Sequence, residues 1–165
     1  MIVVLMGAAG AGKTTVGRAL AEMLGWTFVD ADALHPASNV EKIRAGTPLT
    51  DTDRDPWLAR VRHTIVDFVA RGVDAVLACS ALRARYRTRI GEGIAELRWV
   101  FLDADRELLT ARLRARQGHF AGPDIVESQL RELEPPADVL TLDAELPVPI
   151  LVQHICAAFG LPRTD

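Results

Sequence analysis

The sequence is poor in cysteine, in surplus positive charge and in long apolar runs, and each shortage excludes a class of protein. Cys79 and Cys156 are its only cysteines, and they lack the spacing of a metal site or a disulfide framework. Both lie in apolar stretches, so we expect buried free thiols in a reducing cytoplasm. The 22 acidic residues outnumber the 19 Lys and Arg residues, so no global positive field attracts nucleic acid or anionic lipid.

The apolar run at the N-terminus, Ile2 to Met6, is too short for a signal peptide or a membrane segment and lacks a basic leader. No internal repeat, low-complexity tract or interdomain linker interrupts the chain. With 49% hydrophobic and 25% charged residues, the sequence predicts one domain over residues 1–165. We expect it in the cytoplasm, with neither a nucleic-acid nor a membrane partner.

What is present is a glycine-rich stretch, Gly7 to Thr14, that directly follows the apolar run. It fits the pattern G-x-x-x-x-G-K-[ST], in which glycines let a tight loop turn its backbone N–H groups around nucleotide phosphates. Lys13 is then expected to reach the β- and γ-phosphates, and the Thr14 hydroxyl to coordinate Mg²⁺. Apolar residues at helical spacing follow, so strand, loop and helix stand in the order that aims a helix N-terminus at an anion.

Apolar runs and helical stripes alternate along the rest of the chain, which predicts an α/β fold with a parallel sheet between helices. The expected strands are 27–29, 75–79, 97–102 and 139–142, and the expected helices are 40–45, 56–72, 82–90, 105–117, one from 124, and 149–159. Leu58, Val61, Ile65, Val66 and Val69 form a stripe expected to face the sheet. Residues 35–56 and 117–123 depart from this alternation, and such segments belong at the C-terminal edge of an open sheet, near the ligand.

Two carboxylates follow the second strand, where strand ends face a bound nucleotide. Asp30 and Asp32 are able to hold water on Mg²⁺ and to orient or deprotonate an attacking hydroxyl. The alternative interpretation is a pair of turn-forming aspartates that cap the next segment. The central strand ends in Cys79 and Ser80 rather than in an acid, so Asp30 is the expected metal-holding carboxylate.

Arginines mark two further places in the chain. Arg54 lies among three acids in the segment Asp51 to Trp57, and its planar fork suits a carboxylate. A solvated salt-bridge cluster at a helix start is the alternative. Arg112 and Arg116 lie one helical turn apart and are expected to stabilise the charge of a transferring γ-phosphate, unless they belong to an arginine-rich surface helix.

Together these motifs resemble the motif series of bacterial-type gluconokinases. The series runs from Gly7 to Pro136: the P-loop, DADALHP, Asn39 with Lys42, GTPL, DTDRDPW, CSAL with Tyr86-Arg87, RQGHF, Ser128-Gln129 and LEPP. The resemblance implies ATP-dependent, Mg²⁺-assisted phosphorylation of D-gluconate at its 6-hydroxyl. It also implies a P-loop fold similar to shikimate and nucleoside monophosphate kinases, with a five-stranded parallel sheet in the order 2-3-1-4-5 and a lid at about 117–123. Related kinases suggest a homodimer, which no stretch of this sequence demonstrates.

The same resemblance assigns roles to individual residues. Lys13, Asp32 and Arg116 are the implied catalytic residues, with Asp32 the candidate base and Arg54 the implied partner of the gluconate carboxylate. The implied nucleotide-binding residues are Gly7, Ala8, Ala9, Gly10, Ala11, Gly12, Lys13, Thr14, Thr15, Arg112 and Arg116, and the metal-binding residues are Thr14 and Asp30. The implied substrate-binding residues are Asp32, His35, Arg54, Ser80, Arg83, His119 and Gln129. Ala31 stands where the family commonly has glycine, and Arg83 where lysine is usual.

Two other functions are compatible with the P-loop. A kinase for another small hydroxy acid, such as shikimate or a different aldonate, would share the fold and the phosphate loop. A nucleotide-dependent switch protein would need no small-molecule acceptor. A GTPase would carry an Asn-Lys-x-Asp motif after a strand, and this sequence has none.

Overall fold

The fold is built on a single five-stranded sheet. A computed structural model describes residues 1–115 and 123–162 of the chain. All strand pairs are parallel, and the order β2-β3-β1-β4-β5 confirms the order that the resemblance implied. The strands are β1 (Ile2–Met6), β2 (Thr27–Asp30), β3 (Ala75–Ala78), β4 (Leu97–Asp103) and β5 (Leu140–Asp143).

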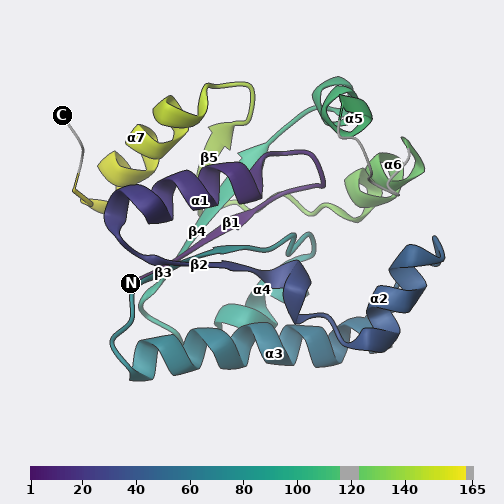
Figure 1. The fold of residues 1–165 in the computed structure, drawn as a ribbon, viewed down its shortest axis with the longest axis horizontal. Coiled ribbons are helices and arrows are strands. Elements are labelled where there is room, and N and C mark those ends of the chain that lie inside the picture. Colours follow the sequence, from purple (N-terminus) through teal and green to yellow (C-terminus); the bar gives the residue numbers. More distant parts are fainter. Residues whose placement is uncertain (116–122, 163–165) are drawn as a thin grey trace.

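Helices cover both faces of this sheet, as parallel strands require (Figure 1). One face carries α1 (Lys13–Leu24) and α7 (Val148–Phe159), and the opposite face carries α3 (Asp51–Ala70) and α4 (Ala84–Gly91). The remaining helical segments are the 3₁₀ helix η1 (Ala31–Leu34), α2 (Ala37–Arg44), α5 (Arg106–Ala115) and α6 (Pro123–Glu132).

Strand β1 shows how the sequence divides the core into two layers. Its side chains alternate, so Val3 and Leu5 pack with the α1 and α7 layer. Ile2, Val4 and Met6 pack with the α3 and α4 layer. Because both faces of the strand are covered, all of its residues are buried, which explains why the sequence shows a continuous apolar run.

The structure corrects the expected start of α3. The sequence favoured a helix from Pro56 and assigned the preceding aspartates to a break, but α3 begins at Asp51. Thr50 and Asp53 form a reciprocal capping box, in which the Asp53 N–H donates to Thr50 Oγ1 and the Thr50 N–H donates to the Asp53 carboxylate. Pro56 lies inside the helix. Acidic residues that look like a helix breaker are therefore its N-terminal cap.

Two smaller expectations about helices also differ from the structure. Helix α2 begins at Ala37, three residues before the predicted Val40, directly after Pro36. Val66 is 43% exposed, whereas Leu58, Val61 and Ile65 are buried. The buried stripe of α3 is narrower than predicted because only one side of this helix faces the sheet.

Cys79 and Cys156 are buried free thiols, as expected.

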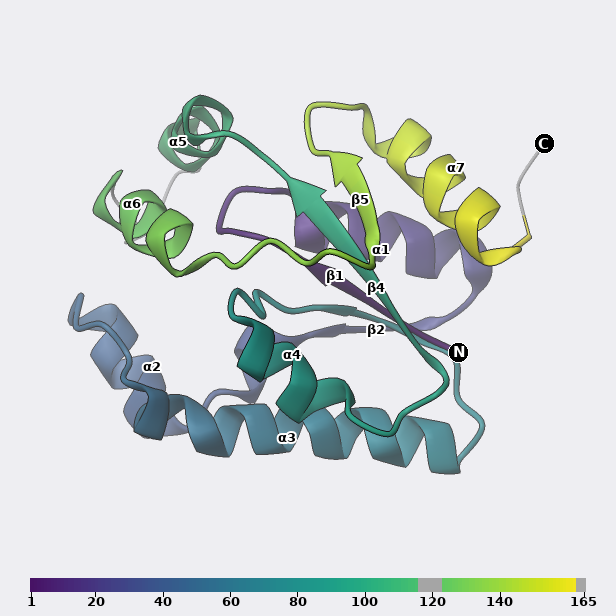
Figure 2. The same cartoon turned by 180° about the vertical axis from the view of Figure 1, so that it is seen from behind.

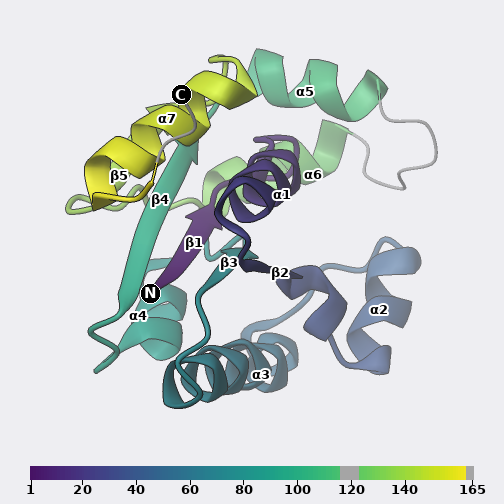
Figure 3. The same ribbon diagram turned by 60° about the vertical axis from the view of Figure 1, so that its left-hand side comes forward.

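The segments that depart from strict alternation meet beyond the carboxyl ends of the strands. Figures 1 and 2 show α5, α6 and α2 beyond that edge. Figure 3 shows α5 and α6 on one side of it and η1 with α2 on the other. Over residues 1–115 and 123–162, no helix is both long and apolar enough to cross a bilayer. The predicted site residues among residues 1–115 and 123–162 lie at this edge of the sheet.

Candidate active site

The phosphate loop is shaped by its glycines. Gly7, Gly10 and Gly12 all have positive φ angles, of 142°, 91° and 99°. At Gly7, a Cβ would lie 2.7 Å from the carbonyl oxygen of Leu102, so no larger residue fits there. Gly12 precedes the first residue of α1 and has no side chain to cap that helix. The first amides of α1 are therefore left for an anion, as in phosphate-binding helix N-termini.

The side chains predicted to bind metal and phosphate meet beside this loop. Lys13 Nζ donates to the carbonyl oxygen of Ala8 at 2.9 Å, which holds the ammonium group over the loop. Thr14 Oγ1 donates to Asp30 Oδ2 at 3.1 Å. A hydroxyl and a carboxylate in contact form the kind of oxygen donor set that Mg²⁺ prefers. The pair thus fits the group that the sequence assigned to it.

Asp32 lies next to this pair, at the start of η1. Its backbone N–H donates to Asp30 Oδ1 at 3.1 Å, so the two aspartates form a tight turn at the end of β2. Loss of hydration raises the pKa of the Asp32 carboxyl, Lys13 lowers it and Asp30 raises it again. Asp32 is nonetheless an exposed residue, so a ligand can reach it. A raised pKa makes Asp32 a better proton acceptor than an ordinary aspartate.

His35 is held as a neutral, oriented ring. It stacks on Trp57 with ring centroids 4.6 Å apart, and its Nδ1 contacts the side-chain amide of buried Asn39 at 3.2 Å. Because the amide nitrogen of Asn39 is a donor, the proton of the neutral ring resides on Nε2. Burial, and after it the nearby charge of Arg54, lowers the pKa of His35 to about 4. At neutral pH the ring therefore offers an N–H donor and no charge.

Arg54 and Arg83 meet in a network of charged and aromatic side chains. Arg54 Nη1 donates to the Tyr86 hydroxyl at 3.1 Å, and its Nη2 lies 3.3 Å from Glu132 Oε2. Arg83 Nε lies 3.7 Å from the same carboxylate oxygen. Asp51 accepts hydrogen bonds from Tyr86 and Arg85. Arg54, the predicted partner of a substrate carboxylate, thus lies beside Arg83, and both guanidinium groups already contact a carboxylate of the protein.

Two of the predicted site residues, Arg112 and Gln129, contact the backbone of the phosphate loop. Arg112 donates to the carbonyl oxygen of Ala11 at 3.2 Å and to that of Ala144 at 2.7 Å. It therefore braces the loop backbone against the end of β5. Gln129 accepts a hydrogen bond of 2.6 Å from the Ala9 N–H. This contact places Gln129 at the loop, and its contact with substrate remains a prediction.

The end of β3 connects the phosphate loop to the acceptor side. The Gly7 N–H donates to the carbonyl oxygen of Ser80 at 3.3 Å, and half-buried Ser80 is followed by Ala81 with a φ of 41°. This is an unfavourable backbone conformation for alanine, and it turns the chain sharply toward Arg83. Thr15 is exposed on α1. Arg116, His119 and the predicted lid segment 117–123, apart from the start of α6, lie outside the described residues.

Some residues at this edge were not predicted as site residues. Tyr86 is the only tyrosine of the chain, and its hydroxyl joins Arg54 to Asp51. Glu132 follows Gln129 by three residues on α6, a spacing that places both side chains on the same side of a helix. That spacing is the signal that could have identified Glu132. Trp57 donates from Nε1 to the carbonyl oxygen of Ala31 at 2.7 Å and so fixes η1 on α3.

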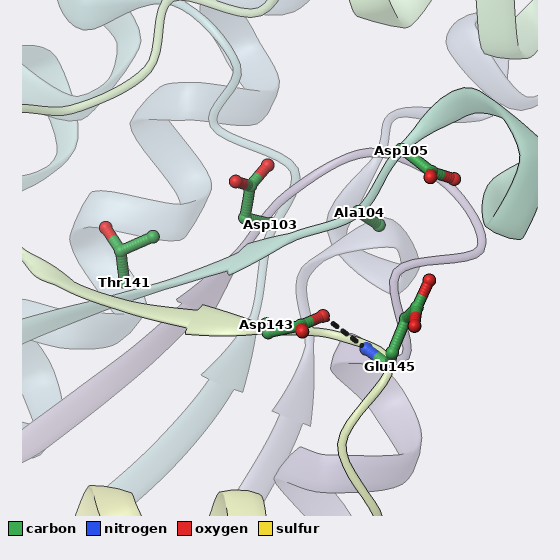
Figure 4. A pocket seen from close by; sticks show the side chains of 6 residues that line it. All are labelled: Asp103, Ala104, Asp105, Thr141, Asp143 and Glu145. Carbon is green, nitrogen blue, oxygen red and sulfur yellow. Dashed lines mark hydrogen bonds between the residues drawn. The ribbon is translucent and has the colours of Figure 1, made fainter.

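A separate acidic hollow of about 470 Å³ lies at the ends of β4 and β5 (Figure 4). Its lining residues are Asp103, Ala104, Asp105, Thr141, Asp143 and Glu145. The concentrated negative charge is unsuited to phosphate. Among the described residues, no group of three or more His, Cys, Asp or Glu side chains has the arrangement of a metal site. The phosphate loop and the arginine pair remain the candidate active site.

A parallel α/β sheet with a P-loop at its central strand and a Thr14–Asp30 oxygen pair beside that loop is typical of P-loop kinases. Comparison with known proteins identifies the family. A family model described as an AAA domain matches residues 2–136. The gluconokinase of Gluconobacter oxydans (strain 621H) is 46% identical over 135 residues, which cover 82% of this chain and 76% of that protein. The chain belongs to the gluconokinase family.

Solved structures agree with this assignment. A gluconokinase from Sinorhizobium meliloti 1021 matches with a TM-score of 0.84 and 37% identity, over 96% of this chain and 90% of that one. An unliganded sugar kinase from Janibacter sp. HTCC2649 matches with a TM-score of 0.89 and 34% identity, over 97% and 94% of the two chains. The resemblance found in the sequence motifs is confirmed.

Proposed function

We propose that this protein transfers the γ-phosphoryl group of ATP to the 6-hydroxyl of D-gluconate, giving 6-phospho-D-gluconate and ADP. The observation that carries the proposal is the adjacency of two unlike sites at one edge of the sheet. The P-loop follows β1, and its Gly7 N–H donates to the carbonyl oxygen of Ser80 after β3, three residues before Arg83, which neighbours Arg54 at Glu132. A phosphoryl donor and a small hydroxy acid can therefore be held side by side.

On the donor side, the loop amides and Lys13 would hold the β- and γ-phosphates of ATP. Thr14 and Asp30 would hold Mg²⁺, which supplies charge neutralisation to the phosphates when bound. Gln129 would sit beside the γ-phosphate position, because it contacts the amide of Ala9 in the loop. Arg112 supports the loop from behind. We keep Arg116 and His119 as predicted members of a lid.

On the acceptor side, residues 35–56 would form the substrate-binding segment. Arg54 and Arg83 would bind the carboxylate of gluconate, and the Nε2–H of His35 would donate to a sugar hydroxyl. Asp32 would take the proton of the 6-hydroxyl as its oxygen attacks the γ-phosphorus. The new O–P bond forms while the bond from phosphorus to the β–γ bridging oxygen breaks, and ADP leaves. The two buried thiols suit a reducing compartment such as the cytoplasm.

A coupled assay for ADP release tests this function. The purified protein with Mg²⁺ and ATP is offered gluconate, other aldonates, shikimate, the neutral polyol D-glucitol, or no acceptor. We expect the highest kcat/KM with gluconate and a phosphorylated product at its 6-position by mass spectrometry and NMR. Efficient transfer to a different acid with none to gluconate would overturn the substrate assignment. ADP release that no acceptor stimulates would overturn the kinase assignment.

A further inference from the structure

Glu132 occupies the arginine pair that we assign to the substrate. Its carboxylate lies 3.3 Å from Arg54 and 3.7 Å from Arg83. The exposed fractions of the Glu132, Arg54 and Arg83 side chains are 20%, 18% and 30%, so the three groups are partly shielded from water. A carboxylate of gluconate that binds both guanidinium groups must displace this glutamate or share them with it.

The geometry of this cluster indicates an exchangeable contact. Close charge-assisted hydrogen bonds have N–O distances of about 2.7–2.9 Å. Lys42 and Asp53 meet that standard at 2.7 Å, but the contacts of Glu132 are longer, at 3.3 and 3.4 Å to Arg54 and 3.7 Å to Arg83. Asp51, the other acid near Arg83 at 3.8 Å, already accepts hydrogen bonds from Tyr86 and Arg85. Glu132 is therefore the acid at this position that is held most loosely.

The neighbouring contacts of α6 allow Glu132 to move alone. Gln129, three residues earlier on the same helix, is tied to the Ala9 N–H of the phosphate loop. Beyond the helix, a Glu134 oxygen accepts from the Ala84 N–H at 2.6 Å, and the Glu134 carbonyl accepts from Arg87. These contacts hold both sides of Glu132 in place. We therefore expect rotation of the flexible Glu132 side chain, without movement of the helix, to release Arg54 and Arg83.

We propose that Glu132 is a specificity-determining residue that competes with the acceptor's carboxylate for Arg54 and Arg83. This inference rests on the function proposed above. The tethered carboxylate weakens the binding of an acidic acceptor, because part of the attraction of the arginines is already satisfied. It also keeps the arginine charges compensated when a neutral polyol is bound, so it narrows the discrimination between acids and polyols.

Glu132→Gln tests this competition, because it removes the charge with little change in shape. We expect the KM for gluconate to fall about 3- to 10-fold, with kcat and the KM for ATP changed less than about 2-fold. The ratio of kcat/KM for gluconate to that for D-glucitol should rise by a similar factor. The matched control is Glu127→Gln on the same helix, whose partner is Arg106 at 2.9 Å and which lies outside the site. We expect this control to behave like the wild type.

A second single variant and a double variant distinguish a glutamate that competes with the substrate carboxylate from a glutamate that positions Arg54. Glu132→Ala should also lower the KM for gluconate, and Glu132→Gln should have less effect when combined with Arg54→Ala. A raised KM in Glu132→Gln would mean that the glutamate positions Arg54, and it would overturn the proposal. An unchanged KM for gluconate in Glu132→Gln, or equal changes in Glu132→Gln and Glu127→Gln, would overturn it as well. Failure of the wild type itself to phosphorylate gluconate would overturn the proposed function together with this inference.

Discussion

The phosphate side and the acceptor side of the candidate active site are formed by different parts of the chain. The phosphate side consists of backbone: three glycines with positive φ, the first amides of α1 and the supporting contacts of Arg112 and Gln129. The acceptor side consists of side chains from α3, α4 and α6, joined by hydrogen bonds and ion pairs. Backbone geometry serves any nucleoside triphosphate, whereas the side-chain network can be adapted to one acceptor. The difference explains why the P-loop identifies only a broad class.

Removal of the Lys13 charge on the phosphate side should have the largest effect. Lys13→Met is expected to lower kcat by about 10³-fold or more, because no backbone group replaces the positive charge at the γ-phosphate. Steady-state kinetics at saturating ATP and gluconate measures this loss, and a thermal melt should show a folded protein. Substantial residual turnover in the folded variant would contradict the division between the two sides.

Substitutions on the acceptor side should mainly change the KM for gluconate. Arg54→Ala is expected to raise the KM for gluconate by about 10- to 100-fold, since hydrogen bonds to charged groups contribute about 1.5–3 kcal/mol. The KM for ATP should change less than about 2-fold. The control is Arg71→Ala at the C-terminal end of the same helix, α3, where the exposed Arg71 lies 2.9 Å from the carboxylate of exposed Asp67. Equal changes in both KM values would show that Arg54 does not belong to the acceptor side alone.

The phosphate side also depends on close packing behind the loop. A Cβ at Gly17 of α1 would lie 2.7 Å from the Phe28 ring and 3.1 Å from Leu5. Gly17→Ala should therefore lower the free energy of unfolding by about 1 kcal/mol, after allowance for the better helix propensity of alanine. Urea unfolding measures this change, and Glu22→Ala on the exposed side of α1 is the control. A stabilised Gly17→Ala variant would mean that the Phe28 ring moves aside.

The smallest effect concerns the pH response of His35. Its pKa of about 4 lies below the value of 6.5 for an ordinary histidine. Between these two pH values the unfolded chain binds a proton that the folded chain does not, so the free energy of unfolding should fall as pH falls from 6.5 to 4. Histidine titration by NMR measures the pKa directly. Arg54→Ala should raise it, because a nearby positive charge is removed; a normal pKa in the wild type would contradict this.

The sequence was sufficient for the general fold because its signals are local. The P-loop pattern and the alternation of apolar runs with helical stripes gave the parallel sheet, and the motif series gave the strand order. The predicted start of α3 was wrong because aspartates can either interrupt a helix or cap the next one. Only the three-dimensional arrangement shows that Thr50 and Asp53 pair with each other.

Fewer features of the candidate site than of the fold could be predicted from the sequence. Residues close in sequence, such as Asp30 and Asp32, were correctly expected to lie together. The contacts of Gln129 with Ala9 and of Glu132 with Arg54 join residues 120 and 78 positions apart. No pattern in a single sequence specifies such pairs, since they depend on where α6 lies relative to the sheet. The assigned roles of these residues remain predictions for the experiments above.

The hydrogen bond from the Gly7 amide to the Ser80 carbonyl ties the two halves of the site through main-chain atoms alone. The position of the phosphate loop relative to Ser80 is thereby set by the spacing of neighbouring strands, which is nearly constant in all proteins, and the proposed transfer distance would follow from it. Side chains around the acceptor are free to change during evolution without lengthening the path that the phosphoryl group travels. Proteins with this fold can therefore evolve toward new substrates while the distance of phosphoryl transfer stays the same.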